Sequence, residues 1–113
     1  LREKQSVFAR NVARLIEWVY ANGYELTLGE AWRPPWVAQE NARRGTGIAN
    51  SIHIDRLAID INLFKGGAWL DNWQDYQRAG EAWKSLHPLN RWGGDFNMLR
   101  DGVHFSMEHE GRA

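Results

Sequence analysis

The segment over residues 57–64 constrains the fold of this chain more than any other. It reads Leu-Ala-Ile-Asp-Ile-Asn-Leu-Phe, so a large aliphatic side chain occupies every second position and Asp60 lies among them. Successive side chains of a strand point to opposite faces of a sheet, so the aliphatic side chains are predicted on one face and Asp60 on the other. A carboxylate with such apolar neighbours is costly to bury unless a partner compensates its charge. The segment therefore predicts a sheet with one buried face and a polar site on the other.

Helices and strands are predicted along the rest of the chain without regular alternation. Apolar residues spaced three and four apart favour helices, alternating residues favour strands, and clustered glycines favour loops. These patterns predict helices over 6–22, 34–44 and 73–86, strands over 24–28, 57–64 and 103–107, and loops over 45–51 and 91–95. Such a mixture is typical of an α+β domain with a small antiparallel sheet flanked by helices. The 113 residues fit one domain, residues 1–113.

The composition narrows the possible partners and metal ligands. Fourteen basic residues balance fourteen acidic ones, so we expect neither a nucleic-acid nor a membrane partner. No apolar run approaches the roughly 20 residues of a membrane helix, and no apolar core of a signal peptide follows the first charges. There is no cysteine, so any metal must be held by His, Asp or Glu. We expect a monomer.

Seven tryptophans are many for this length. One interpretation is that they fill the core of a small domain. The other is that Trp32, Trp36 or Trp92 lines a groove for an extended ligand. The sequence leaves both open.

Two histidines and Asp60 form a candidate metal site. His104 occupies a polar position of the last predicted strand, and His53 precedes Asp60 by seven residues. Two imidazoles and one carboxylate are a common ligand set for catalytic zinc, and without sulfur the same set also accepts nickel, cobalt or iron. A packed core histidine, or a simple pair of His53 with Asp60, would leave the same pattern.

Two further polar residues are candidates for catalysis. Asp101 lies three residues before His104, so its carboxylate could act as a general base near the metal, or it could cap its own turn. Arg33 precedes a proline and suits the binding of a carboxylate or an oxyanion, although a solvated surface arginine has the same appearance.

Four elements of the chain resemble one family. Residues 51–60, Ser-Ile-His-Ile-Asp-Arg-Leu-Ala-Ile-Asp, resemble the Ser-x-His-x-x-Gly-x-Ala-x-Asp signature of the D-alanyl-D-alanine carboxypeptidase group of zinc peptidases. That group includes the vancomycin-resistance dipeptidase and carboxypeptidase, and phage endolysins that cut the L-alanyl-D-glutamate bond. Residues 101–105 are similar to its second signature, an acid three residues before the last histidine ligand. Arg33 with Gln39 resembles its upstream Arg-x5-Gln element, and residues 92–95 resemble a Trp-Gly-Gly segment of the endolysin branch.

The resemblance implies a role for each of these residues. It implies one zinc ion held by His53, Asp60 and His104, with Asp101 as catalytic base and Arg33 steadying the substrate carbonyl or the oxyanion. It also implies a fold like that of Hedgehog and the D-alanyl-D-alanine peptidases.

Supporting residues and departures from the family pattern follow from the same comparison. Ser51, Gln39 and Trp92 are expected to support the site or to bind substrate. Arg56 stands where the signature usually has Gly, which we expect to narrow the site, and Ala31 replaces a frequent Gly ahead of the arginine.

The implied function is hydrolysis of a peptide bond in the stem peptides of bacterial peptidoglycan, by a carboxypeptidase, dipeptidase or endopeptidase activity. The protein would act on the cell wall, in the periplasm or outside the cell, and a phage-type lysin released through a holin fits this expectation. The alternative is a non-catalytic, zinc-containing cell-wall-binding module on the same scaffold.

Overall fold

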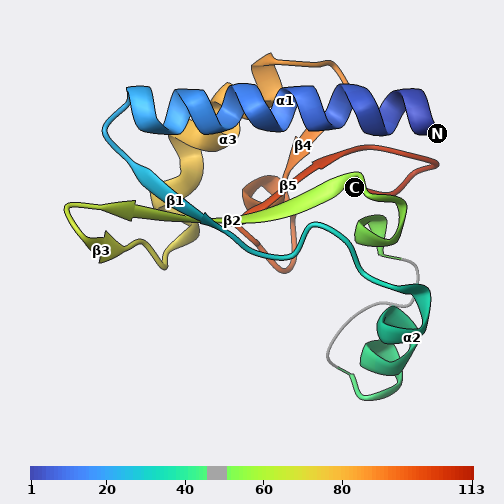
Figure 1. Ribbon diagram of the computed structural model, residues 1–113. Coiled ribbons are helices and arrows are strands. Elements are labelled where there is room, and N and C mark those ends of the chain that lie inside the picture. Colours follow the sequence, from blue (N-terminus) through green and yellow to red (C-terminus); the bar gives the residue numbers. More distant parts are fainter. Residues whose placement is uncertain (46–50) are drawn as a thin grey trace.

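The computed structural model describes residues 1–45 and 51–113 (Figure 1). Helices and strands are mixed, and the predicted α+β fold with a small antiparallel sheet is confirmed. The α-helices are α1 (Arg2–Ala21), α2 (Pro35–Arg43) and α3 (Gln77–Ser85). The strands are β1 (Glu25–Leu28), β2 (Ala58–Lys65), β3 (Ala68–Trp69), β4 (Asn90–Trp92) and β5 (His104–Met107). Short 3-10 helices are η1 (Ile52–Asp55), η2 (Trp73–Tyr76) and η3 (Gly93–Asp95).

Strand β2, which contains the alternating segment, lies inside the sheet. The order is β1-β2-β5-β4, with β3 also paired to β2, and every pair is antiparallel. In the register of β2 with β5, Asp60 lies opposite His104 and Ile59 lies opposite Phe105. Residues directly opposite in an antiparallel pair share a face of the sheet. The register therefore places the carboxylate and one imidazole side by side.

The hydrophobic core covers the other face of β2. Ile59, Ile61 and Leu63 are buried, whereas Asp60 and Asn62 between them are partly exposed, as the alternation predicts. Helices α1 and α3 pack on this apolar face, and in Figure 1 α1 runs along one side of the sheet while α2 stands apart from the body. The polar site is thus on the face that these two helices leave open.

Several predicted boundaries differ from those observed. Helix α1 begins four residues before the predicted start, because its first turn is polar and exposed and shows no apolar stripe. Residues 73–86 form η2 and then α3, rather than one long helix. The loop predicted over 91–95 is wrong: it contains the end of β4 and η3, which are too short for a periodic pattern. Residues 46–50 of the predicted loop over 45–51 lie outside the described residues.

The tryptophans divide between the two interpretations. Trp83 and Trp92 are fully buried, so Trp92 does not line a groove, and that part of the prediction is wrong. Trp32 and Trp36 are exposed, with 44% and 71% of their surface accessible. The described helices include none with the length and apolar character needed to cross a bilayer.

Candidate metal centre

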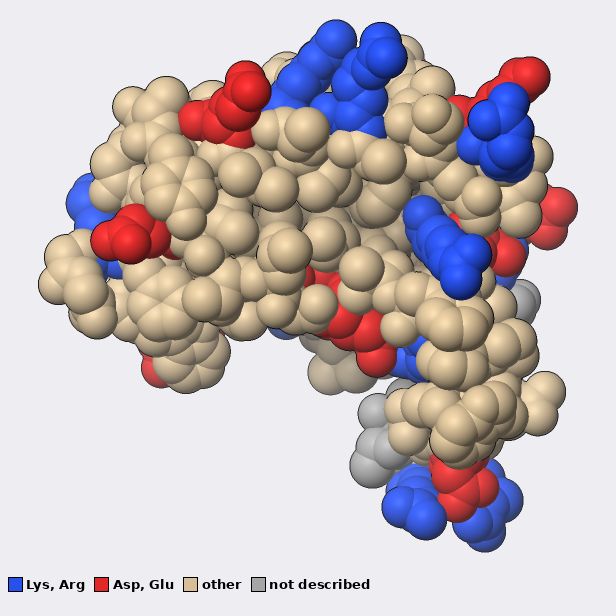
Figure 2. Space-filling view, viewed as in Figure 1, with Lys and Arg blue, Asp and Glu red and all other residues tan. Residues whose placement is uncertain are grey.

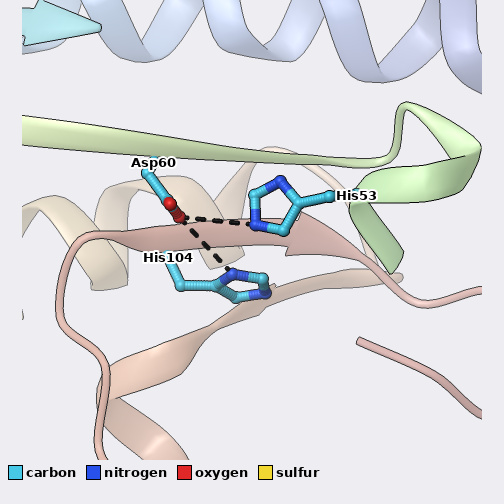
Figure 3. Close-up of side chains that lie close together, drawn as sticks. All are labelled: His53, Asp60 and His104. Carbon is cyan, nitrogen blue, oxygen red and sulfur yellow. Dashed lines mark ion pairs between the residues drawn. The ribbon is translucent and has the colours of Figure 1, made fainter. Parts of the chain in front are cut away.

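The structure brings His53, Asp60 and His104 together (Figure 3). His53 comes from η1, Asp60 from the middle of β2 and His104 from the first position of β5. His53 Nε2 lies 3.5 Å from Asp60 Oδ1, and His104 Nδ1 lies 3.7 Å from the same oxygen. The two rings are 5.3 Å apart between centroids. Asp60 is therefore more than a partner for one histidine, because one of its oxygens faces both.

The geometry fits a metal ion. Ligand bonds of about 2.0–2.1 Å in a tetrahedral site place neighbouring donor atoms roughly 3.3 Å apart, close to the two distances from Asp60 Oδ1. One donor atom from each of the three residues lies within 4.8 Å of the others. Asp60 Oδ1 is also buried without a hydrogen-bond partner among the described residues. Two nitrogens and one carboxylate oxygen are donors that suit zinc.

The electrostatics favour a charged Asp60. Burial by itself raises the pKa of the Asp60 carboxyl, but the close approach and the charges of His104 and His53 outweigh burial and lower the pKa to about 2. The carboxylate is therefore ionised at neutral pH, which is the form that binds a metal.

A short capped turn holds His53 in place. The Ser51 hydroxyl oxygen accepts a hydrogen bond from the His53 backbone N–H at 3.2 Å and caps η1. Arg56 ends η1 in the left-handed conformation, with φ of +57°. Glycine adopts this conformation at no steric cost, which explains why the family signature prefers Gly here.

Arg56 does not narrow the metal site, contrary to the expectation. Its guanidinium lies 4.6 Å from the centre of the Trp32 ring, and the Trp32 indole N–H donates to the carbonyl oxygen of Ile54. Both side chains line a separate apolar cavity beside α1. A cation stacked on an aromatic ring is a favourable pair, and here it holds the arginine away from the ligands.

A cavity of about 490 Å³ joins the three ligands to the candidate catalytic residues. Its described lining consists of Arg33, Ser51, Ile52, His53, Asp60, Phe96, Leu99, Arg100, Asp101, His104 and Ala113. Arg33 is mostly buried, and its Nε atom has no hydrogen-bond partner among the described residues. Gln39 is exposed on α2 and absent from the described lining, so the structure does not bring it to the site.

The Trp-Gly-Gly segment shapes the loop that carries Asp101. The buried Trp92 indole N–H donates to the carbonyl oxygen of Gly102 at 2.8 Å. The Asp101 backbone N–H donates to the carbonyl oxygen of Gly93 at 3.0 Å, and the Asp101 carbonyl accepts from the His104 N–H at 3.1 Å. A Cβ atom at Gly93 would overlap the Asp101 carbonyl oxygen. Trp92 therefore supports the Asp101 loop from the core, and its side chain is not part of the described lining of the cavity.

Asp101 has the environment of a base. Burial raises the pKa of the Asp101 carboxyl above its usual value of 3.8, and the charge of Asp60 adds to this. The charges of His104 and His53 and a backbone hydrogen bond from Val103 act in the opposite direction. A raised pKa brings a carboxylate closer to the range in which it both takes and returns a proton.

Glu30 is a site residue that the sequence did not indicate. Its Oε1 lies 2.5 Å from Arg33 Nη2 and 3.6 Å from His53 Nδ1. Its backbone carbonyl accepts from the Asp60 N–H at 2.9 Å, so the chain after β1 continues along β2. The only signal in the sequence is the spacing of three residues between Glu30 and Arg33, which is common for surface pairs.

Comparison with known proteins agrees with this geometry. The family model described as D-alanyl-D-alanine carboxypeptidase matches residues 44–107, which contain His53, Asp60, Asp101 and His104. A search of curated proteins found no match. Among solved structures, the L-Ala D-Glu endopeptidase ChiX of Serratia marcescens is similar, with a TM-score of 0.72 and 21% identity over 95% of this chain and 85% of that chain. The family model covers more than half of the chain, and the chain therefore belongs to the D-alanyl-D-alanine carboxypeptidase family of peptidases.

Proposed function

We propose that this protein is a zinc-dependent peptidase that hydrolyses a peptide bond in the stem peptides of bacterial peptidoglycan. The observation that carries the proposal is the single cavity that contains the three candidate ligands together with Asp101 and Arg33. The family to which the chain belongs supports a peptidase, and the similar structure is named as an L-Ala D-Glu endopeptidase.

One zinc ion would be held by His53 Nε2, one Asp60 oxygen and His104 Nδ1. When bound, the ion supplies Lewis acidity to the scissile carbonyl and to the attacking water. The ring nitrogens must be unprotonated at these two positions, and the low pKa of Asp60 keeps the third donor ionised.

Asp101 and Arg33 would perform the remaining steps. Asp101 takes a proton from the attacking water and returns it to the leaving amine, which is the work of a carboxylate with a raised pKa. The Arg33 guanidinium stabilises the negative charge that develops on the carbonyl oxygen or binds a substrate carboxylate. A non-catalytic wall-binding module would need neither residue in the cavity.

The bond to test first is L-Ala–D-Glu, because the similar solved structure is an L-Ala D-Glu endopeptidase. Purified peptidoglycan is digested with the zinc-loaded protein, and the products are analysed by mass spectrometry. Cleavage of L-Ala–D-Glu and release of D-Ala give different masses, so the experiment separates the endopeptidase from the carboxypeptidase. Binding to the wall without new amine ends would contradict the proposal and favour the binding module.

The place of action follows from the substrate. A peptidase of stem peptides works at the cell wall, in the periplasm or outside the cell, and a phage-type release through a holin stays a prediction. The expected monomer is also part of the proposal.

A further inference from the structure

The carboxylate of Glu30 lies behind the candidate metal centre and faces two of its functional residues. Its Oε1 is 2.5 Å from Arg33 Nη2 and 3.6 Å from His53 Nδ1. Its main-chain carbonyl accepts the hydrogen bond of the Asp60 N–H. One residue therefore adjoins a metal ligand, the main chain of a second ligand and the arginine of the cavity.

The orientation of the His53 ring leaves its Nδ1 atom in need of a hydrogen-bond acceptor. Nε2 faces Asp60 Oδ1, so Nδ1 is the ring nitrogen that points away from the metal centre. His53 is buried, with 4% of its surface accessible, and Nδ1 has no hydrogen-bond partner within normal distance among the described residues. A histidine that binds a metal through Nε2 must carry its proton on Nδ1, and that proton needs an acceptor. Glu30 Oε1 is the charged oxygen that faces it.

We propose that Glu30 is a positioning residue of the metal centre. Its carboxylate accepts a hydrogen bond from the Nδ1–H group of His53. This favours the tautomer whose Nε2 carries no proton and is free to bind metal. The same oxygen holds the Arg33 guanidinium at the wall of the cavity. This inference rests on the proposed metal centre but not on the identity of the substrate.

The Glu30–Arg33 pair differs from an ordinary surface pair, and the chain contains a matched example of the latter. Glu40 pairs with Arg43 at 2.6 Å with the same spacing of three residues, and also with Arg44. The Arg43 side chain is 71% exposed, whereas that of Arg33 is 16% exposed. Figure 2 shows the acidic group at the tip of α2 between two basic groups, away from the body of the protein.

Exposed pairs of this kind contribute little to the stability of the fold. Glu40 therefore provides a control in which the same charge is removed without contact with a candidate ligand.

The test compares Glu30→Gln with Glu40→Gln in the full chain. Zinc affinity is measured by competition with a chromophoric chelator. Removal of a carboxylate that orients a histidine ligand lowers metal affinity about 10- to 100-fold, so this loss is expected for Glu30→Gln. The Glu40→Gln variant should bind zinc as the parent protein does. Equal affinities for the two variants would overturn the proposal.

A second readout uses the metal-free protein and does not depend on zinc. Nitrogen NMR of the histidine rings reports which ring nitrogen carries the proton. Asp60 faces Nε2 as Glu30 faces Nδ1, so Glu30→Ala should lower the share of His53 rings that carry the proton on Nδ1, relative to the parent and to Glu40→Gln. Circular dichroism establishes that each variant is folded. An unchanged tautomer in folded Glu30→Ala would overturn the proposal.

The outcomes also separate this inference from the proposed function. A parent protein that binds zinc but cleaves no stem peptide would contradict the peptidase proposal and leave the role of Glu30 supported by the affinity loss. A parent protein that binds no zinc would contradict the metal centre, and the ring tautomer alone would then decide whether Glu30 orients His53.

Discussion

The ionised carboxylate of Asp60 would destabilise the fold if it were buried alone, but it stabilises the fold beside its two histidine partners. It lies between buried aliphatic neighbours, and only interactions with two histidines keep its pKa near 2. An acid whose folded pKa is below its unfolded value stabilises the fold above that unfolded value. Its contribution is therefore present above pH 3.8 and is lost as the pH falls toward 2. The proposed metal ligand Asp60 thus also connects η1, β2 and β5 through its two histidine partners.

The ligand role of His104 predicts a joint loss of metal and activity. His104→Ala removes one of three donors, so the protein should be purified without zinc and should show no peptidase turnover. Metal analysis of the purified variant and digestion of peptidoglycan measure the two effects. Full metal content in a folded His104→Ala variant would contradict the ligand assignment.

The proposed base role of Asp101 predicts that its substitution lowers turnover but leaves zinc binding intact. Asp101→Asn removes the proton acceptor but none of the three donors, so zinc should be retained while kcat falls about 100-fold or more. A fully active Asp101→Asn variant would show that another group is the base.

The raised pKa of Asp101 also predicts how kcat/KM depends on pH in the acidic range. A general base works only when ionised, so kcat/KM should fall as the pH drops through the pKa of Asp101, which lies above 3.8. The stability contribution of this group has the opposite sign to that of Asp60: it is present below the unfolded pKa and is lost as the pH rises through the folded pKa. Measurement of kcat/KM between pH 3 and 8 on zinc-loaded protein tests the first statement, and an acid limb at or below pH 3.8 would contradict it.

At the scale of elements, two glycines have no room for a side chain: Gly93 in the loop between β4 and β5, and Gly80 in α3. A Cβ at Gly93 would overlap the carbonyl oxygen of Asp101 and approach the Cβ of His104, and a Cβ at Gly80 would overlap the ring of Trp92. Both overlaps involve buried groups, but only the first involves the candidate catalytic loop. The Trp-Gly-Gly segment thus connects core packing to the position of the base.

This difference predicts different outcomes for two substitutions. Gly93→Ala and Gly80→Ala should each lower the free energy of unfolding by about 1–3 kcal/mol through overpacking. Gly93→Ala should lower kcat of the folded protein more than Gly80→Ala does, because it displaces Asp101 directly, whereas Gly80→Ala acts on that loop only through Trp92. Denaturant unfolding and turnover at saturating substrate measure the two effects. Equal kcat values for the two folded variants would contradict a positioning role for Gly93.

Helix α1 and strand β2 were predictable, and so were the four-residue strands β1 and β5, whereas β3 and β4 were not. Strand β2 and helix α1 have enough residues for a period of two or of 3.6 to show in the sequence. Strand β4 has three residues, and its fit in the sheet depends on pairing with β5 rather than on its own pattern. Gln39 was expected at the site from family spacing alone, but the described cavity does not include it.

At the scale of the whole molecule, the candidate ligands come from three segments that are separate in the chain. His53, Asp60 and His104 lie on η1, β2 and β5, so an ion bound by all three would connect the turn before β2 to both central strands. Anything that binds only the folded state stabilises it according to its concentration and affinity.

Zinc removal should therefore lower the melting temperature. At a free zinc concentration 100 times the Kd, binding contributes about 2.7 kcal/mol, which corresponds to roughly 10 °C for a domain of this size. Melting curves with zinc, with a chelator and after zinc is restored measure the effect. Identical melting temperatures with zinc and with a chelator would contradict a resident metal that connects these elements.

The sequence by itself determined the local features: the alternating strand, the polar face that carries Asp60, and the supply of nitrogen and oxygen donors without sulfur. These follow from periodicity and composition, which depend on neighbouring residues only. The tertiary structure decided that Trp92 is buried, that Asp101 and Arg33 share one cavity, and that Glu30 faces His53. Those relations join residues far apart in the chain, and they arise because strand register and the path of the chain along β2 bring them together.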